Sequence, residues 1–219
     1  MEITKLSSQI KNPDRINVFL NNKYEFSLDI TQIVDLGIKV GNNYNEEEIA
    51  SLRREGEFSK YYMKAMVYSL TRPRSVREIN DYLYRQTRTK TYLVKGERRE
   101  RIGMAPELTQ RIINKLIEKK YLDDEIFARY WVENRNIKKG VSERVLRQEL
   151  IKKGVPLETT ESVIGSSSRS DEEELRKVIL KRHHRYSDNE KFTRYLIGKG
   201  YRYDQVKEAL SELSEEDVS

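Results

Sequence analysis

The sequence contains no cysteine, and it has few histidines and no long apolar run. Without cysteine, disulfides and Cys-based zinc sites are excluded, and we expect a reducing compartment. No stretch approaches the roughly 18 apolar residues of a membrane span, and nothing near Met1 resembles a signal peptide. We therefore expect a cytoplasmic protein with no membrane partner.

The sequence also lacks the usual catalytic and metal-binding patterns. His183 and His184 are the only histidines. They are adjacent, so on a helix they diverge by about 100° and are poorly placed to share a metal ion. No Gly-rich phosphate loop and no Gly-x-Ser-x-Gly turn occurs. We predict a protein that is not an enzyme, with no catalytic residue, no metal and no cofactor.

Charge is abundant but unevenly distributed. Lys and Arg number 42 against 36 Asp and Glu, a formal net charge of +6. Residues 1–55 hold seven basic and nine acidic side chains, a net of −2, which leaves +8 for residues 56–219. Any contact with a polyanion is therefore predicted in the later part of the chain.

The first 55 residues show the period-two alternation of β-strands. Apolar residues alternate with polar ones over 16–20 and again over 24–28, on either side of an Asn-Asn-Lys turn. This predicts a hairpin. A short helix is then expected to end at Gly37, and the acidic run at 46–48 suits the start of another helix.

From about residue 57 the apolar spacing changes to the 3.6-residue period of helices, and it repeats. Residues 150–155 match residues 196–201 at an offset of 46. Eight residues before the anchor leucine of each unit stands a residue suited to cap a helix: Ser75, Ser142 or Asp188. Three units therefore share one three-helix layout.

The predicted fold is mainly α, with three tandem three-helix repeats forming an elongated curved array after a small β-rich N-terminal unit. The expected first helices are 58–71, 124–138 and 171–186, the second are 75–86, 142–153 and 188–199, and the third are 108–119, 157–164 and 203–213. The expected domains are 1–55, 56–122, 123–168 and 169–219.

Two segments interrupt this pattern. Residues 85–104 form the most basic segment of the chain, and their strand-like alternation predicts a protruding hairpin inserted in the first repeat. Residues 165–170 have the composition of a linker, which we expect to let the second and third repeats pivot.

Basic side chains recur beside the middle helix of each repeat. A charged helix face is usually only solvated, but recurrence along stacked helix pairs favours one basic surface suited to a filament or a nucleic-acid backbone. The candidate binding residues are Arg74, Arg77, Arg85, Lys138, Lys139, Arg144, Arg147, Lys152 and Lys153.

One group of residues between 121 and 154 stands out by its combined order and spacing, although individually its members are mostly structural: Tyr121, Leu122, Asp123, Asp124, Phe127, Ala128, Arg129, Gly140, Arg144, Glu149, Leu150 and Gly154. This order and spacing resemble the central signature of the RecX regulatory proteins. The three-repeat layout extends the resemblance over about 57–213, and the β-rich start resembles the extension found in some members. The basic insertion at 85–104 departs from the family pattern.

The resemblance implies a regulator that binds the RecA recombinase along its filament on single-stranded DNA. Separately, we expect a monomer. Members of this family restrain the ATPase, strand exchange and SOS coprotease activities of RecA without chemistry of their own. A second hypothesis is a helical-repeat module that binds DNA or RNA directly, and a third is an adaptor for another protein.

Overall fold

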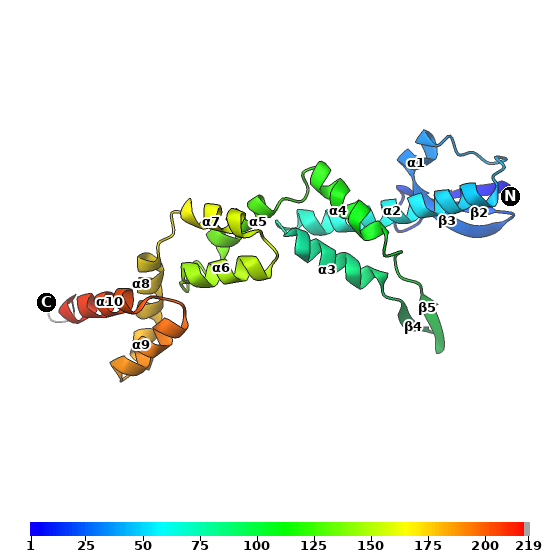
Figure 1. The fold of residues 1–219 in the computed structure, drawn as a ribbon. Coiled ribbons are helices and arrows are strands. Elements are labelled where there is room, and N and C mark those ends of the chain that lie inside the picture. Colours follow the sequence, from blue (N-terminus) through cyan, green and yellow to red (C-terminus); the bar gives the residue numbers. More distant parts are fainter. Residues whose placement is uncertain (217–219) are drawn as a thin grey trace. The chain divides into compact units, whose positions relative to one another are not determined.

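The chain folds into two compact units in a computed structural model that describes the backbone of residues 1–216 and the side chains of residues 1–212 (Figure 1). The first unit comprises Met1–Arg72 and Ile79–Tyr121. The second comprises Pro73–Glu78 and the chain from Leu122 onward. No helix in the described part of the chain combines the length and apolar character needed to span a bilayer.

The first unit begins with a three-stranded antiparallel sheet in the order β1-β2-β3. Its elements are β1 (Ile3–Ser8), β2 (Arg15–Leu20), β3 (Lys23–Asp29) and the short helix α1 (Ile30–Asp35). The predicted hairpin is confirmed, because β2 and β3 pair in antiparallel register. Asn21 and Asn22 adopt the left-handed conformation that its tight turn requires. Strand β1 was not predicted, since its apolar residues show no long alternation.

Helix α2 (Glu46–Leu70) lies against this sheet as one continuous helix. Separate helices near 46 and from 58 were expected, so the predicted boundary at 55/56 falls inside α2. Gly56 lies within the helix, where a β-carbon would sit 2.3 Å from the carbonyl oxygen of Ser27. Buried Arg15 donates hydrogen bonds to the carbonyls of both Gly56 and Ser27, at 2.9 and 2.7 Å. Gly56 therefore permits a close approach to β3 that Arg15 stabilises.

The helical part of this unit carries the basic insertion as a hairpin. The elements are α3 (Val76–Thr87), β4 (Lys90–Val94), β5 (Glu97–Arg101) and α4 (Leu108–Glu118), and α4 packs on α2. Strands β4 and β5 pair in antiparallel register, as predicted for residues 85–104. The hairpin extends away from α3 and α4 (Figure 1), and all its strand residues except Val94 are exposed.

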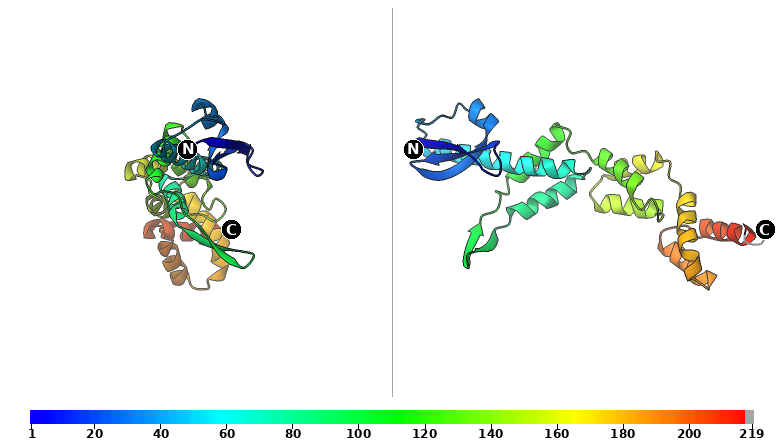
Figure 2. Two further views of the ribbon diagram at one scale, coloured as in Figure 1. Left: turned by 90° about the vertical axis from the view of Figure 1, so that its right-hand side faces the viewer. Right: turned by 180° about the vertical axis from the view of Figure 1, so that it is seen from behind.

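The second unit contains two three-helix repeats (Figure 2). Their elements are α5 (Asp124–Asn134), α6 (Glu143–Lys152) and α7 (Leu157–Gly165), then α8 (Asp171–Arg182), the 3₁₀ turn η1 (His183–Arg185), α9 (Asn189–Gly198) and α10 (Tyr203–Glu216). Each repeat has its own apolar core, centred on Phe127 and Leu150 in one and on Phe192 and Leu196 in the other. The three-helix layout predicted from the sequence is confirmed, with helix ends shifted by a few residues.

One joint occurs twice within the second unit. Fully buried Ser142 caps α6 and donates a hydrogen bond to the carbonyl of Lys199 at 2.8 Å, and the N–H of Glu143 donates to Asp171. Fully buried Ser75 makes the same bond to the carbonyl of Lys153 at 2.7 Å. The N–H of Val76 likewise donates to Asp124. Each serine thus accepts from its own helix and donates to the end of another helix.

We expect Ser142→Ala to destabilise the protein by about 2 kcal/mol, because it removes a helix cap and leaves a buried carbonyl without its donor. The control is Ser170→Ala, since exposed Ser170 caps α8 and its side chain donates no hydrogen bond to another described residue. This change should cost no more than about 1 kcal/mol. Urea unfolding measures the stability of both variants. Equal losses of stability would show that the hydrogen bond from Ser142 to Lys199 contributes nothing beyond the helix cap.

Candidate anion-binding cleft

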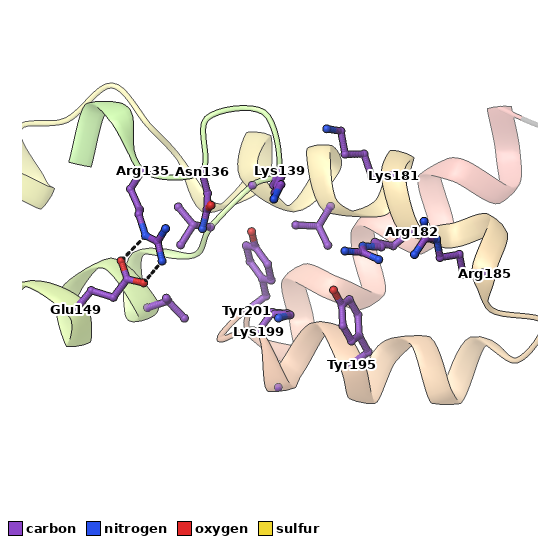
Figure 3. A pocket seen from close by; sticks show the side chains of 15 residues that line it. Arg135, Asn136, Lys139, Glu149, Lys181, Arg182, Arg185, Tyr195, Lys199 and Tyr201 are labelled. Carbon is purple, nitrogen blue, oxygen red and sulfur yellow. Dashed lines mark hydrogen bonds and ion pairs between the residues drawn. The ribbon is translucent and has the colours of Figure 1, made fainter. Parts of the chain in front are cut away.

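A cavity of about 520 Å³ opens between the two repeats of the second unit (Figure 3). Its walls are the loop that follows α5, helix α6, the end of α8 with η1, and the end of α9 with the residues after it. The charged and aromatic lining residues are Arg135, Lys139, Glu149, Lys181, Arg182, Arg185, Tyr195, Lys199 and Tyr201. The apolar part of the wall comes from Val141, Val145 and Val178.

The cleft carries a large excess of positive charge. Its lining includes six basic side chains and one carboxylate, that of Glu149. Arg135 donates two hydrogen bonds of 2.7 and 2.8 Å to this carboxylate, and the Trp131 indole donates a third. None of the other five basic residues forms an ion pair with a carboxylate among residues 1–212.

Tyr201 adds an unpartnered polar group to this wall. The side chain is 2% exposed, and its hydroxyl has no hydrogen-bond partner among the described residues. Burial raises the pKa of this hydroxyl above its ordinary value, so it remains a neutral donor. Figure 3 shows the hydroxyl directed toward the loop that carries Asn136 and Lys139.

A buried ionic network holds the walls together. Arg169 donates to the Glu174 carboxylate at 2.6 and 3.1 Å and to the carbonyls of Val132 and Arg135. Lys177 donates to the same carboxylate at 2.7 Å, as does the N–H of Val141 at 3.0 Å. The predicted pivot at 165–170 is therefore tied to both repeats, because Arg169 within it bonds to both sides of the joint.

This arrangement is suited to binding an anion. Several cations converge on one concave site, and a buried hydroxyl has an unused proton to donate. Phosphate and carboxylate oxygens are the groups that such donors recognise. No group of three or more histidines and carboxylates in the described part of the chain is arranged to hold a metal ion.

The nine basic residues predicted from the sequence lie in different surroundings. Lys139 lines the cleft. Arg147 is paired with Glu161 at 2.6 Å, and Lys153 is paired with Glu78 at 2.7 Å. Arg74 lies 4.0 Å from Glu78 and is partly buried. The exposed members of the set are Arg77, Arg85, Lys138, Arg144 and Lys152.

Five basic residues of the cleft were not among the predicted site residues: Lys181, Arg182, Arg185, Lys199 and Arg135. The first three belong to the run Lys-Arg-His-His-Arg at 181–185, which is a local signal of concentrated charge. The sequence does not show that this run faces Lys139, because the two segments meet only when the repeats pack.

The signature residues between 121 and 154 have structural roles in this unit. Asp123 caps α5, while Asp124 accepts the N–H of Val76, and burial raises the pKa of Asp124. Phe127 is fully buried, and Gly140 adopts a left-handed φ of +75° in the wall of the cleft. These positions therefore build the repeat and its joints.

The chain is similar to known proteins over most of its length. Residues 1–45 match the regulatory protein RecX N-terminal domain, and residues 123–164 match the second three-helix domain of RecX. A regulatory protein RecX from Bacillus licheniformis is 30% identical over 217 residues, which cover 96% of this chain and 76% of the relative. One from Bacillus subtilis is 28% identical, covering 98% of this chain and 78% of the relative.

Solved structures share the fold. A crystal structure of regulatory protein RecX, 20% identical, superposes with a TM-score of 0.69 over 96% of this chain and 98% of that chain. The RecX structure from Lactobacillus salivarius, 24% identical, gives a TM-score of 0.55 over 72% of this chain and 97% of the other. Because the Bacillus licheniformis relative reaches 30% identity across three quarters of its own length, this chain belongs to the RecX family of regulatory proteins.

Proposed function

We propose that this protein binds RecA filaments on single-stranded DNA and restrains the RecA ATPase, strand exchange and SOS coprotease activities. Membership in the RecX family is the observation that carries this proposal. The relatives are named regulatory proteins, which supports a role without catalysis. On this proposal the protein acts in the cytoplasm, as a monomer.

The cationic cleft supports a specific way of binding. Five of its six cations lack an ion-pair partner among the described side chains. A phosphate or carboxylate group that enters the cleft can therefore pair with cations that already face it. We propose that the cleft holds an anionic group of the DNA-loaded filament. Arg77, Arg85, Arg144 and Lys152, exposed beside the middle helices, supply longer-range attraction.

RecA ATPase on preformed single-stranded DNA filaments tests this proposal. The protein is titrated from well below to equal amounts of RecA, with DNA-only binding measured at the same salt concentration. Inhibition at ratios too low to compete for the DNA is the expected result. Inhibition that appears only when the DNA is saturated would contradict it and favour a direct nucleic-acid binder, the second function that the cleft supports.

The variant Lys181→Gln/Arg185→Gln tests the role of the cleft. Removing two converging charges should raise the concentration needed for half-inhibition about tenfold. Arg194→Gln/Lys207→Gln is the matched control, because both residues are exposed, lie in the same repeat and are absent from the cleft lining. If the two double variants raised the concentration needed for half-inhibition equally, the effect would come from net charge and not from the cleft.

A further inference from the structure

The β4–β5 hairpin has two chemically different faces. Residues directly opposite in an antiparallel pair share a face, and the register places Lys90 opposite Arg101 and Tyr92 opposite Arg99. Val94 and Glu97 complete this face, and Glu97 lies 3.5 Å from Arg99. We call it the basic face, because its other charged residues are cations. The other face carries Thr91, Leu93, Arg98 and Glu100. Only the basic face therefore combines exposed cations with an exposed aromatic ring.

The basic face is not explained by the stability of the hairpin. Like charges directly opposite each other are destabilising, and Lys90 and Arg101 are such a pair. An isolated two-stranded hairpin is also marginally stable, and this one is exposed along both strands. The Lys90–Arg101 pair therefore costs stability, and an anion bound between the two charges would offset that cost.

Two lysines of α2 continue the basic face at the base of the hairpin. The ammonium groups of Lys60 and Lys64 lie 5.3 and 5.1 Å from the centre of the Tyr61 ring. The same ring lines a small hollow together with Lys90 and Arg101. Cations from α2, β4 and β5 thus gather around one tyrosine.

These four cations have no ion-pair partner among the side chains of residues 1–212. Burial, with the nearby charges of Arg101, Lys60 and Lys90, lowers the pKa of Lys64 to about 8. Burial and Arg101 also lower the pKa of Lys60, although Glu57 opposes that shift. The charges repel one another, and an anion placed among them relieves this repulsion.

We propose that a single strand of nucleic acid binds along the basic face of the β4–β5 hairpin and onto α2, with phosphates at Lys90, Arg101, Lys60 and Lys64 and a base stacked on Tyr92. An aromatic ring flanked by cations is the usual surface of single-strand binders. A duplex, whose major groove admits a two-stranded ribbon, is the competing ligand, but its stacked bases are not available to Tyr92. An acidic peptide would pair with the cations but offers no base to stack on Tyr92, so the Tyr92 variant distinguishes it from a single strand.

The site is independent of RecA, so the test uses the full-length protein alone. Fluorescence anisotropy at low salt measures binding to a labelled thymidine oligonucleotide and to a duplex of equal length. Lys90→Gln/Arg101→Gln should weaken single-strand binding about tenfold and reduce the slope of log affinity against log salt by about 1.4. Lys95→Gln/Arg98→Gln, which removes two charges from the turn and the opposite face, should change affinity less than about threefold.

A second pair of variants tests stacking. Tyr92→Ala should weaken binding about tenfold, whereas Leu93→Ala on the opposite face should leave it unchanged. All these residues are exposed, so circular dichroism should show unaltered folding. Equal losses for the two charge pairs, no loss for Tyr92→Ala, or tighter binding to the duplex than to the single strand would overturn the proposal. Loss of RecA inhibition in these variants is not required, so the two proposals fail separately.

The dependence of affinity on pH gives a third readout. The basic groups near Lys64 are Lys60, Lys90, Arg101 and Arg15, and the carboxylates Asp14 and Asp29 line the same cavity as Lys64. Phosphate binding favours protonated Lys64, so affinity should fall about tenfold between pH 7 and pH 9 as the free lysine loses its proton. Lys64→Met should bind more weakly at pH 7 but lose most of this dependence. An unchanged pH profile in this variant would contradict phosphate contact at Lys64.

Discussion

Replacing Glu174 with glutamine is expected to lower the free energy of unfolding by about 3 kcal/mol, the scale of a broken buried ion pair. The Glu174 side chain is 2% exposed and accepts hydrogen bonds from Arg169, Lys177 and the N–H of Val141. Glutamine has nearly the same shape but no charge, so buried Arg169 loses its counterion. Urea unfolding at pH 7 measures the difference.

The control for this substitution is Glu172→Gln on the same helix. Glu172 is exposed and lies 3.6 Å from Arg176, so its loss should cost no more than about 0.5 kcal/mol. Losses of similar size in the two variants would contradict the importance of the buried network. A large loss confined to Glu174→Gln would show that this network holds the cleft walls in place.

The effect of Glu174 should also depend on pH. Burial favours the neutral acid, but the bonds from Arg169 and Lys177 outweigh it and hold the pKa of Glu174 below its ordinary value. The contribution of the ionised group is therefore complete above about pH 4.3 and is lost as the pH falls through the lowered pKa. The stability difference between the wild type and Glu174→Gln should shrink in acid. A difference that grows in acid would contradict this sign.

The substitution Gly140→Ala is expected to destabilise the protein by about 3 kcal/mol. Gly140 has a φ of +75°, which costs an alanine roughly 1–2 kcal/mol. The added β-carbon would also sit 2.3 Å from the carbonyl oxygen of Glu174 and 2.7 Å from Cγ2 of Val178, so the loop must move away from α8. Thermal or urea unfolding measures the loss, and the cleft should open with it.

Gly165→Ala is the matched control for this prediction. Its β-carbon would meet no atom within 4 Å, and the backbone is helical without a positive φ. We expect a change within about 0.5 kcal/mol, or a slight stabilisation from reduced freedom of the unfolded chain. A comparable loss at both glycines would show that the close approach at Gly140 is not responsible.

Most helices were predictable because their signals are local. The apolar spacing and the caps at Ser142 and Asp188 placed α6 and α9 to within one residue, and the glycine stops placed their ends. The strand-like alternation in the basic insertion likewise predicted β4 and β5. The separate helices expected within 46–70 were wrong, because α2 runs through Gly56, a residue that is unfavourable in an isolated helix. Its close approach to Ser27, which the structure shows, offsets that cost.

The cleft and the hairpin site could not be predicted in full from the sequence. The sequence located basic segments, but whether a cation is paired depends on carboxylates that are distant in the chain. Arg147 and Lys153 looked like binding residues and are held by Glu161 and Glu78, whereas Lys181 was overlooked and remains without a described carboxylate partner.

The sequence by itself determined the helical repeats, their caps, the N-terminal and inserted hairpins, the absence of cysteine chemistry and the family resemblance. These depend on residue type and on neighbours a few positions away. The tertiary structure decided that Ser75 and Ser142 act as joints as well as caps, since each hydroxyl donates to a carbonyl 78 or 57 residues away. It also decided which cations converge without counterions, because only packing brings such distant side chains within a few ångströms of one another.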